Sequence, residues 1–257
     1  MGDDLAGEKI LSELHEIQNL NCNFVRKENS SITGFTISLI RNDGERLFLS
    51  SLGHQKLFSL NHGKEDLLEL IKDGDLVHVS GFFMLPRIRH ELQSFVSKVK
   101  KKGADTSFDP GWDPEGFGKD TKSIIRSNLP KFDYFEPDLV EMTALASVRS
   151  PEGAAKKISQ DYPGIIALKE GKNGSRAFQN GKVVARAKAI PSRVSDTTGA
   201  GDSFDAGFLS GILEGYDLPL CLKLGNTAAS ITISEKSRSL PDFRKLFDYA
   251  MYQSTQN

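Results

Sequence analysis

The chain has 257 residues, of which 38% are hydrophobic and 26% charged, and this ordinary globular composition excludes a disordered or fibrous chain. The length suits one substantial α/β domain better than two compact ones. The 33 basic and 34 acidic side chains nearly cancel, so no broad positive field would attract a nucleic acid or an anionic membrane.

The first half of the chain predicts a helix, a hairpin and then alternating helices and strands. Apolar residues at helical spacing predict a helix over about 2–20. Two β-rich runs, 33–40 and 46–51, flank the Asp43-Gly44 dipeptide that is typical of a tight hairpin turn, so segment 21–52 is expected to form a small β lid. Further on, helices are expected at 64–72 and 87–102 and strands at 76–79 and 106–108.

The second half continues this alternation. Strands are expected at 134–135 and 164–168, a second hairpin around Asn180 and Gly181, and helices at 200–213, at 220–233 and after Pro241. Alternation of this kind predicts a doubly wound, mostly parallel sheet flanked by helices, because crossover connections between parallel strands are right-handed.

Nothing in the sequence indicates a cysteine-based site, a histidine metal site or a membrane-spanning segment. Cys22 and Cys221 have no Cys-x-x-Cys spacing, and no histidine pair lies at the helical spacing of a metal site. No apolar run approaches the ~20 residues that cross a bilayer, and no basic and apolar leader opens the chain. We therefore expect a cytoplasmic protein without nucleic-acid or membrane partners.

Residues 196–208 carry the clearest chemical signal, Asp-Thr-Thr-Gly-Ala-Gly-Asp-Ser-Phe-Asp-Ala-Gly-Phe. Gly199 and Gly201 allow a sharp bend before a helix, whose free N–H groups would face an anion. We interpret Gly199, Ala200 and Gly201 as an anion hole for a phosphoryl group. Phosphoryl transfer also needs a base for the attacking hydroxyl, and Asp202 is the candidate. For an isolated Gly-x-Gly-Asp the alternative is a plain turn capped by the aspartate.

The whole run resembles the second signature of the PfkB carbohydrate kinase family, which reads Asp-Thr-x-Gly-Ala-Gly-Asp and then x-Phe-x-Ala-Gly-Phe. The resemblance extends along most of the chain and implies a ribokinase-like fold, ATP and Mg²⁺ as cofactors, and a sugar or related alcohol as substrate. Asp4, Thr33 and Gly34 resemble parts of the family's substrate-binding and lid segments. Asp109 stands at a predicted strand end, where ligands usually bind in such sheets.

The resemblance also gives candidates for the nucleotide and its metal. Asp138 and Glu141 correspond to the family's Asn-x-x-Glu, so Glu141 would help to hold Mg²⁺ through water, although an aspartate replaces the asparagine near the phosphates. The alternative role of Asp138 is to cap the helix that carries Glu141. The other nucleotide-binding candidates are Lys169, Gly171 and Gly174, which could form a plain hairpin turn instead, and Asn226, which could serve helix packing.

Two departures from the family pattern bear on activity. The family's first strand, with its sugar-binding aspartate, and the following Gly-Gly segment have no counterpart, so the kinase domain over 1–257 is expected to be N-terminally incomplete. A late or truncated start, a partner that supplies the missing part and a loss of transfer activity all stay open. After Ile233, residues 234–239 lack the family's Gly-Ala turn, which makes a monovalent cation doubtful although Asp196 and Thr197 match.

The leading hypothesis is a carbohydrate kinase that transfers the γ-phosphate of ATP to a sugar hydroxyl. A nucleoside kinase of the same fold and a non-catalytic protein that binds a nucleotide or a partner are the alternatives. A homodimer formed through the lid strands is a further expectation.

Overall fold

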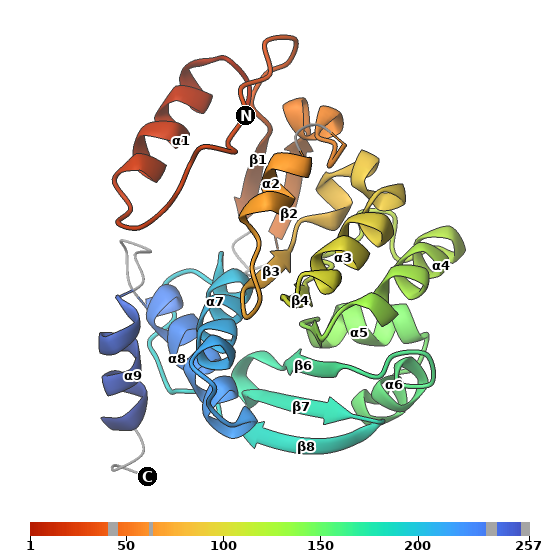
Figure 1. The fold of residues 1–257 in the computed structure, drawn as a ribbon. Coiled ribbons are helices and arrows are strands. Elements are labelled where there is room, and N and C mark those ends of the chain that lie inside the picture. The colour runs from red at the N-terminus through yellow and green to blue at the C-terminus, as the bar shows by residue number, and fades with distance from the viewer. Residues whose placement is uncertain (41–45, 62–63, 235–240, 253–257) are drawn as a thin grey trace. The chain divides into compact units, whose positions relative to one another are not determined.

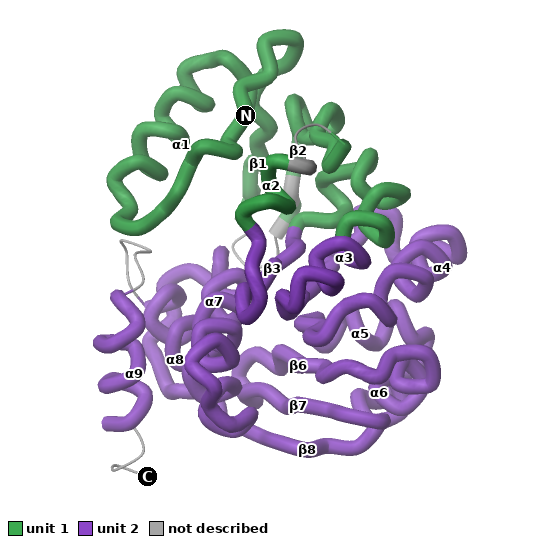
Figure 2. The backbone as a smooth tube through the Cα atoms, viewed as in Figure 1, with its two compact units in different colours: residues 1–70, 81–95 green, residues 71–80, 96–257 purple. Residues whose placement is uncertain are grey.

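The computed structural model describes residues 1–40, 46–61, 64–234 and 241–252 (Figure 1). The turn predicted at Asp43-Gly44 and most of the segment after Ile233 lie outside these residues. The chain divides into two compact units, shown in Figure 2. Unit 1 comprises 1–70 and 81–95, and unit 2 comprises 71–80 and 96–257. The unit that carries the hairpin is therefore larger than the predicted lid segment 21–52.

Unit 1 contains one longer helix, a two-stranded sheet and short helical turns. Helix α1 (Leu5–His15) begins where Asp4 accepts a hydrogen bond from the Gly7 amide, and it ends earlier than predicted. Strands β1 (Phe35–Ile40) and β2 (Arg46–Ser51) pair antiparallel, as predicted, in a sheet of their own. The remaining elements are α2 (Lys64–Leu70) and the 3₁₀ turns η1 (Gly53–Leu57), η2 (Phe82–Met84) and η3 (Pro86–His90).

Unit 2 is built on a six-stranded sheet with the order β3-β4-β5-β6-β7-β8. The first four strands run parallel, and each pairs with the next. The last two form the predicted hairpin, in which Asn180 and Gly181 adopt positive φ angles of 52° and 72°. The strands are β3 (Leu76–Val79), β4 (Asp105–Phe108), β5 (Tyr134–Phe135), β6 (Ile165–Lys169), β7 (Ser175–Gln179) and β8 (Lys182–Ala187).

Helices cover both faces of this sheet, which confirms the predicted α/β architecture (Figure 1). On one face, α7 (Ala200–Leu213) and α8 (Leu218–Ser234) approach closely because three neighbouring strands present small side chains there, Ala167, Ala177 and Ala185. On the other face lie α5 (Leu139–Ala146) and α6 (Pro151–Ile158). The helices α3 (Leu92–Lys101), α4 (Lys119–Asn128) and α9 (Phe243–Tyr252) complete the fold. None of the described helices has the length and apolar character to cross a membrane.

Helices α7 and α8 touch almost backbone to backbone. A Cβ atom added at Gly207 would lie 2.6 Å from the Leu224 carbonyl oxygen, and one added at Gly225 would lie 2.8 Å from ring atoms of Phe204. Both distances are shorter than real Cβ contacts, so only glycine fits at these two positions without a shift of the helices. This packing fixes the start of α7 relative to α8.

Candidate active site

A cavity of about 470 Å³ lies in unit 2 at the carboxyl ends of the parallel strands. Asp109, Asp138 and Lys169 reach it from the ends of β4, β5 and β6, and Gly201 and Asn226 reach it from α7 and α8. This edge of an open α/β sheet is the usual place for a ligand. The other predicted residues that line the cavity are Glu141, Gly171, Gly174 and Ala200.

The first turn of α7 presents free amides toward this part of unit 2. Gly199, at the N-cap of the helix, has a φ of 80°, which produces the sharp bend that the sequence predicts. The amide of Ala200 donates to the Thr197 carbonyl oxygen at 3.3 Å. In the described part of the chain, the amides of Gly201 and Asp202 have no hydrogen-bond partner. The Gly199 amide likewise has no hydrogen-bond partner among the described residues, so the amides of Gly199, Gly201 and Asp202 are available to an anion, whereas that of Ala200 is engaged.

The ammonium group of Lys169 lies between two carboxylates. Its Nζ atom is 2.9 Å from Asp109 Oδ2 and 3.1 Å from Asp205 Oδ1, and the lysine side chain is only 11% exposed. Burial opposes the lysine charge, but the carboxylates of Asp205 and Asp109 outweigh it and hold the pKa of Lys169 above its usual range. A Cβ atom at Gly201 would lie 3.6 Å from Nζ, so a fixed positive charge adjoins the free amides of α7.

Asp138 and Glu141 form a capping box at the start of α5. Asp138 Oδ1 accepts from the Glu141 amide at 2.7 Å, and Glu141 Oε2 accepts from the Asp138 amide at 2.8 Å. Asp138 therefore caps the helix that carries Glu141, which was the alternative role predicted from the sequence. Burial, and then the nearby charge of Asp138, raise the pKa of Glu141 to about 7. Oδ2 of Asp138 and Oε1 of Glu141 accept no hydrogen bond within the described ranges, and both residues line the cavity.

The turn between β6 and β7 is a hairpin turn, which was one of the two interpretations of Lys169, Gly171 and Gly174. The same turn forms one wall of the cavity. Gly171 and Gly174 have φ angles of 56° and 91°, which favour glycine. Asn226 Nδ2 donates to the carbonyl oxygens of Ala187 and Lys188, at 3.1 and 3.0 Å, so this asparagine ties α8 to the end of β8.

A second cavity, of about 620 Å³, lies beside the first and shares four lining residues with it, Gly171, Ala200, Asn226 and Ala229. Much of its remaining lining is apolar, with Ile190, Pro191, Val194 and Ile233. The two cavities together therefore offer a polar end beside the α7 amides and an apolar end beside α8.

The substrate-side candidates of unit 1 form a local network of their own. Asp4 accepts hydrogen bonds from the Thr33 amide at 2.7 Å, from Thr33 Oγ1 at 2.6 Å and from the Gly7 amide at 2.8 Å. The bonds from Thr33, with that from Gly7, lower the pKa of Asp4 to about 2. The Gly34 amide donates to His54 Nδ1 at 3.0 Å. These groups are engaged in holding unit 1 together.

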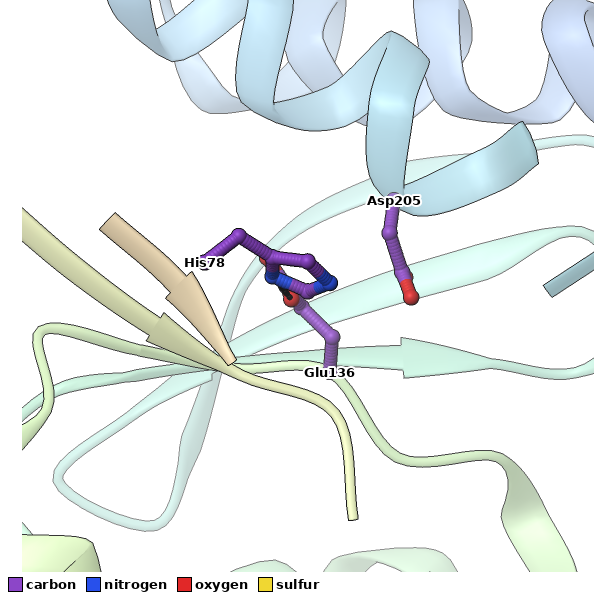
Figure 3. Close-up of side chains that lie close together, drawn as sticks. All are labelled: His78, Glu136 and Asp205. Atoms are coloured by element: carbon purple, nitrogen blue, oxygen red, sulfur yellow. Dashed lines mark ion pairs between the residues drawn. The ribbon is translucent and has the colours of Figure 1, made fainter. Parts of the chain in front are cut away.

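Sequence reasoning missed three titratable residues that the structure gathers in unit 2, namely His78, Glu136 and Asp205 (Figure 3). They come from β3, from the residue directly after β5, and from α7. One signal was available for Glu136, since a charged residue directly after a short buried strand stands where ligands bind. Asp205 lies in a variable position of the signature, so the motif gave no reason to select it.

The chain resembles known carbohydrate kinases in sequence and in structure. The pfkB family carbohydrate kinase model matches residues 1–243, so the chain belongs to this family. A ribokinase from Arabidopsis thaliana is 28% identical over 255 residues, which cover 94% of this chain but only 63% of the relative.

Two solved structures support the fold. The structure of Arabidopsis thaliana ribokinase complexed with ribose and ATP has a TM-score of 0.78 at 25% identity and covers 97% of this chain and 80% of that chain. An E. coli protein solved in complex with ATP and Mg²⁺ has a TM-score of 0.84 at 18% identity and covers 98% and 81% of the two chains. These similarities confirm the predicted ribokinase-like fold.

The Lys169 arrangement predicts a large stability effect. Lys169→Met leaves Asp109 and Asp205 buried without their cation, so we expect the free energy of unfolding to fall by about 3 kcal/mol or more at pH 7. Chemical denaturation measures this change. Lys182→Met, at an exposed position of β8, is the control and should change stability little.

A second substitution makes this test specific. Adding Asp205→Asn to Lys169→Met removes one of the two unpaired carboxylates and should recover part of the lost stability. If Lys169→Met and the unaltered protein have the same free energy of unfolding, the ion pairs make no net contribution to stability.

Proposed function

We propose that this chain is a phosphotransferase that moves the γ-phosphate of ATP to a hydroxyl group of a sugar or sugar-like substrate. One observation carries the proposal most strongly. Gly201, whose amide is free, and Lys169 both line a cavity on the carboxyl edge of the sheet, and a Cβ atom added at Gly201 would lie 3.6 Å from Lys169 Nζ. Amides at a helix N-terminus and a buried cation are the groups that stabilise a phosphoryl group in transfer.

In the proposed complex ATP extends across both cavities. The apolar end beside Ile190, Val194 and Ile233 suits the adenine ring, and the turn from Gly171 to Gly174 follows the phosphates toward α7. The γ-phosphate would then meet the amides of Gly201 and Asp202. The structure of Arabidopsis ribokinase with ribose and ATP supports a nucleotide and a sugar as the two ligands.

Asp202 is the proposed base. It is exposed in the first turn of α7 and directly follows Gly201, which lines the cavity, although Asp202 is not itself a lining residue. In the proposed complex an acceptor bound over this turn would meet its carboxylate while the amides hold the phosphate. The carboxylate would accept the proton of the attacking hydroxyl as the bond to phosphorus forms. The ammonium group of Lys169, which Asp109 and Asp205 already pair, would be the nearest cation to the equatorial oxygens in this arrangement.

The residues at the cavity fit a magnesium ion. Mg²⁺ prefers carboxylate oxygens and keeps several of its waters. Oε1 of Glu141 and Oδ2 of Asp138 are carboxylate oxygens not used by the capping box, so Glu141 would hold the ion through water and Asp138 would lie nearby. When bound, Mg²⁺ would neutralise part of the charge on the ATP phosphates.

The base makes a direct prediction. Asp202→Asn should lower the rate of acceptor-dependent ADP release about 10²-fold or more, because the amide cannot accept the proton, while ATP binding persists. The measurement is ADP release from Mg-ATP with a panel of sugars and nucleosides, together with the Kd of ATP. Asp120→Asn, the same change in the first turn of α4, is the matched control and should retain activity.

The outcomes of this assay separate the alternatives. Release that depends on one acceptor and on Asp202 names the substrate class, sugar or nucleoside. Full turnover by the Asp202→Asn protein would remove the aspartate from the mechanism. No release by folded protein that binds ATP would favour a non-catalytic nucleotide-binding role.

We also propose that two copies of the chain associate through the lid strands. One face of the β1–β2 sheet is apolar and exposed, with fractions between 48% and 56% for Phe35, Ile37, Leu39, Leu47 and Leu49. Ile37 pairs with Leu49 and Leu39 with Leu47, which makes the face continuous. A second copy would present the same face, so a symmetric contact would cover both.

The proposed dimer predicts a change of oligomeric state in a lid variant. Leu49→Glu should convert a dimer to a monomer in analytical ultracentrifugation, because it places a charge in the middle of the apolar face. Ser38→Glu places the same charge on the opposite face of the hairpin and should leave the dimer intact. A protein that sediments as a monomer at every concentration before any substitution would contradict the proposal.

A further inference from the structure

The cluster of His78, Glu136 and Asp205 has the composition of a metal site. One ligand atom from each residue can be chosen so that all three lie within 4.8 Å of one another. In Figure 3 the His78 ring overlaps the Glu136 carboxylate, and one ring nitrogen is on the side of Asp205. The three residues come from three separate elements of unit 2, which the sheet and α7 bring together.

Glu136 is the residue that most needs a partner. It is 0% exposed, and neither of its carboxylate oxygens has a hydrogen-bond partner within the described residues. The nearest basic atom is His78 Nδ1, at 3.4 Å from Oε2. Leaving a buried carboxylate without a partner costs several kcal/mol unless a proton or a cation neutralises it.

The charges around the cluster do not balance by themselves. Asp109 and Asp205 share the single ammonium group of Lys169, and Glu136 adds a third carboxylate beside them. With all three ionised and His78 neutral, the group carries two negative charges in excess. Burial raises the pKa of the Glu136 carboxyl to about 8. One divalent cation would balance the group, and so would two protons.

We propose that His78, Glu136 and Asp205 bind one divalent transition-metal cation, of the Zn²⁺ or Mn²⁺ class. His78 Nδ1 lies 2.6 Å from Ser107 Oγ and 3.4 Å from Glu136 Oε2, and Nε2, the other ring nitrogen, is the proposed ligand atom. Metal bonds of about 2.0–2.2 Å place ligand atoms roughly 3–4 Å apart, so small side-chain rotations close the site. An imidazole ligand favours these ions over Mg²⁺.

This site is separate from the proposed magnesium position at Glu141 and does not rest on the proposed function. The two positions differ in their donors, since the magnesium position offers carboxylates and no imidazole. Asp205 belongs to the cluster and also accepts hydrogen bonds from Lys169 Nζ at both carboxylate oxygens, at 3.1 and 3.2 Å, so the ion would share this carboxylate with the lysine that lines the cavity. Its role would be to fix Asp205, and through it the position of the Lys169 charge.

Metal binding to the purified chain tests the proposal directly. After removal of metals with a chelator, the protein is titrated with Co²⁺ at neutral pH and with excess Mg²⁺ present, and the visible absorption of bound cobalt is followed. We expect saturation at one equivalent and displacement by Zn²⁺. Glu136→Gln and His78→Gln should each weaken cobalt binding about tenfold or more. Thermal melting without metal shows that each variant is folded.

Glu141→Gln serves as the discriminating control. Cobalt binding that persists in Glu141→Gln and is lost in Glu136→Gln assigns the ion to the cluster. Binding that is lost in Glu141→Gln but retained in Glu136→Gln would place the ion at the capping carboxylates and overturn the proposal. Absence of cobalt binding by folded protein would also overturn it and would leave protons as the neutralising groups.

Discussion

The buried ion pairs of Lys169 organise the candidate site. One ammonium group joins the end of β6 to the end of β4 through Asp109 and to α7 through Asp205. A charged group in this position has to be neutralised in the interior, and under the proposed function it also has to act on a ligand at the cavity wall. The two carboxylates meet the first demand, and the closeness of Nζ to Gly201 meets the second.

The same interaction explains why the site contains acidic residues that are not candidates for catalysis. The role of Asp109 and Asp205 is to pair with the Lys169 ammonium group. Without that group, the charges of the two carboxylates would repel a phosphate. The capping box at α5 follows the same principle, because Asp138 and Glu141 each use one oxygen for the backbone and keep the other for the cavity. Structural and chemical roles are therefore shared by the same side chains.

The sequence predicted much of the fold and part of the site. Hydrophobic periodicity located the strands and the long helices α7 and α8, because these elements bury continuous apolar surfaces. It did not indicate α4 and α6, which are short and largely polar. The signature at 196–208 predicted the bend at Gly199, since local sequence determines a loop-to-helix turn, and it supplied Asp202 as the proposed base. It could not show that the Ala200 amide is engaged with Thr197, or that His78 meets Glu136 and Asp205, because such contacts depend on how distant segments pack.

The glycine contacts between α7 and α8 affect more than the packing of two helices. Because Gly207 and Gly225 leave no space for a side chain, α7 can neither slide nor roll on α8 without a clash. The amide dipoles at its first turn are therefore held in one direction by the fold, which would preorganise them for the proposed phosphoryl group. Reorienting such dipoles during a reaction would add to the barrier, so the free energy needed to align them is supplied when the chain folds.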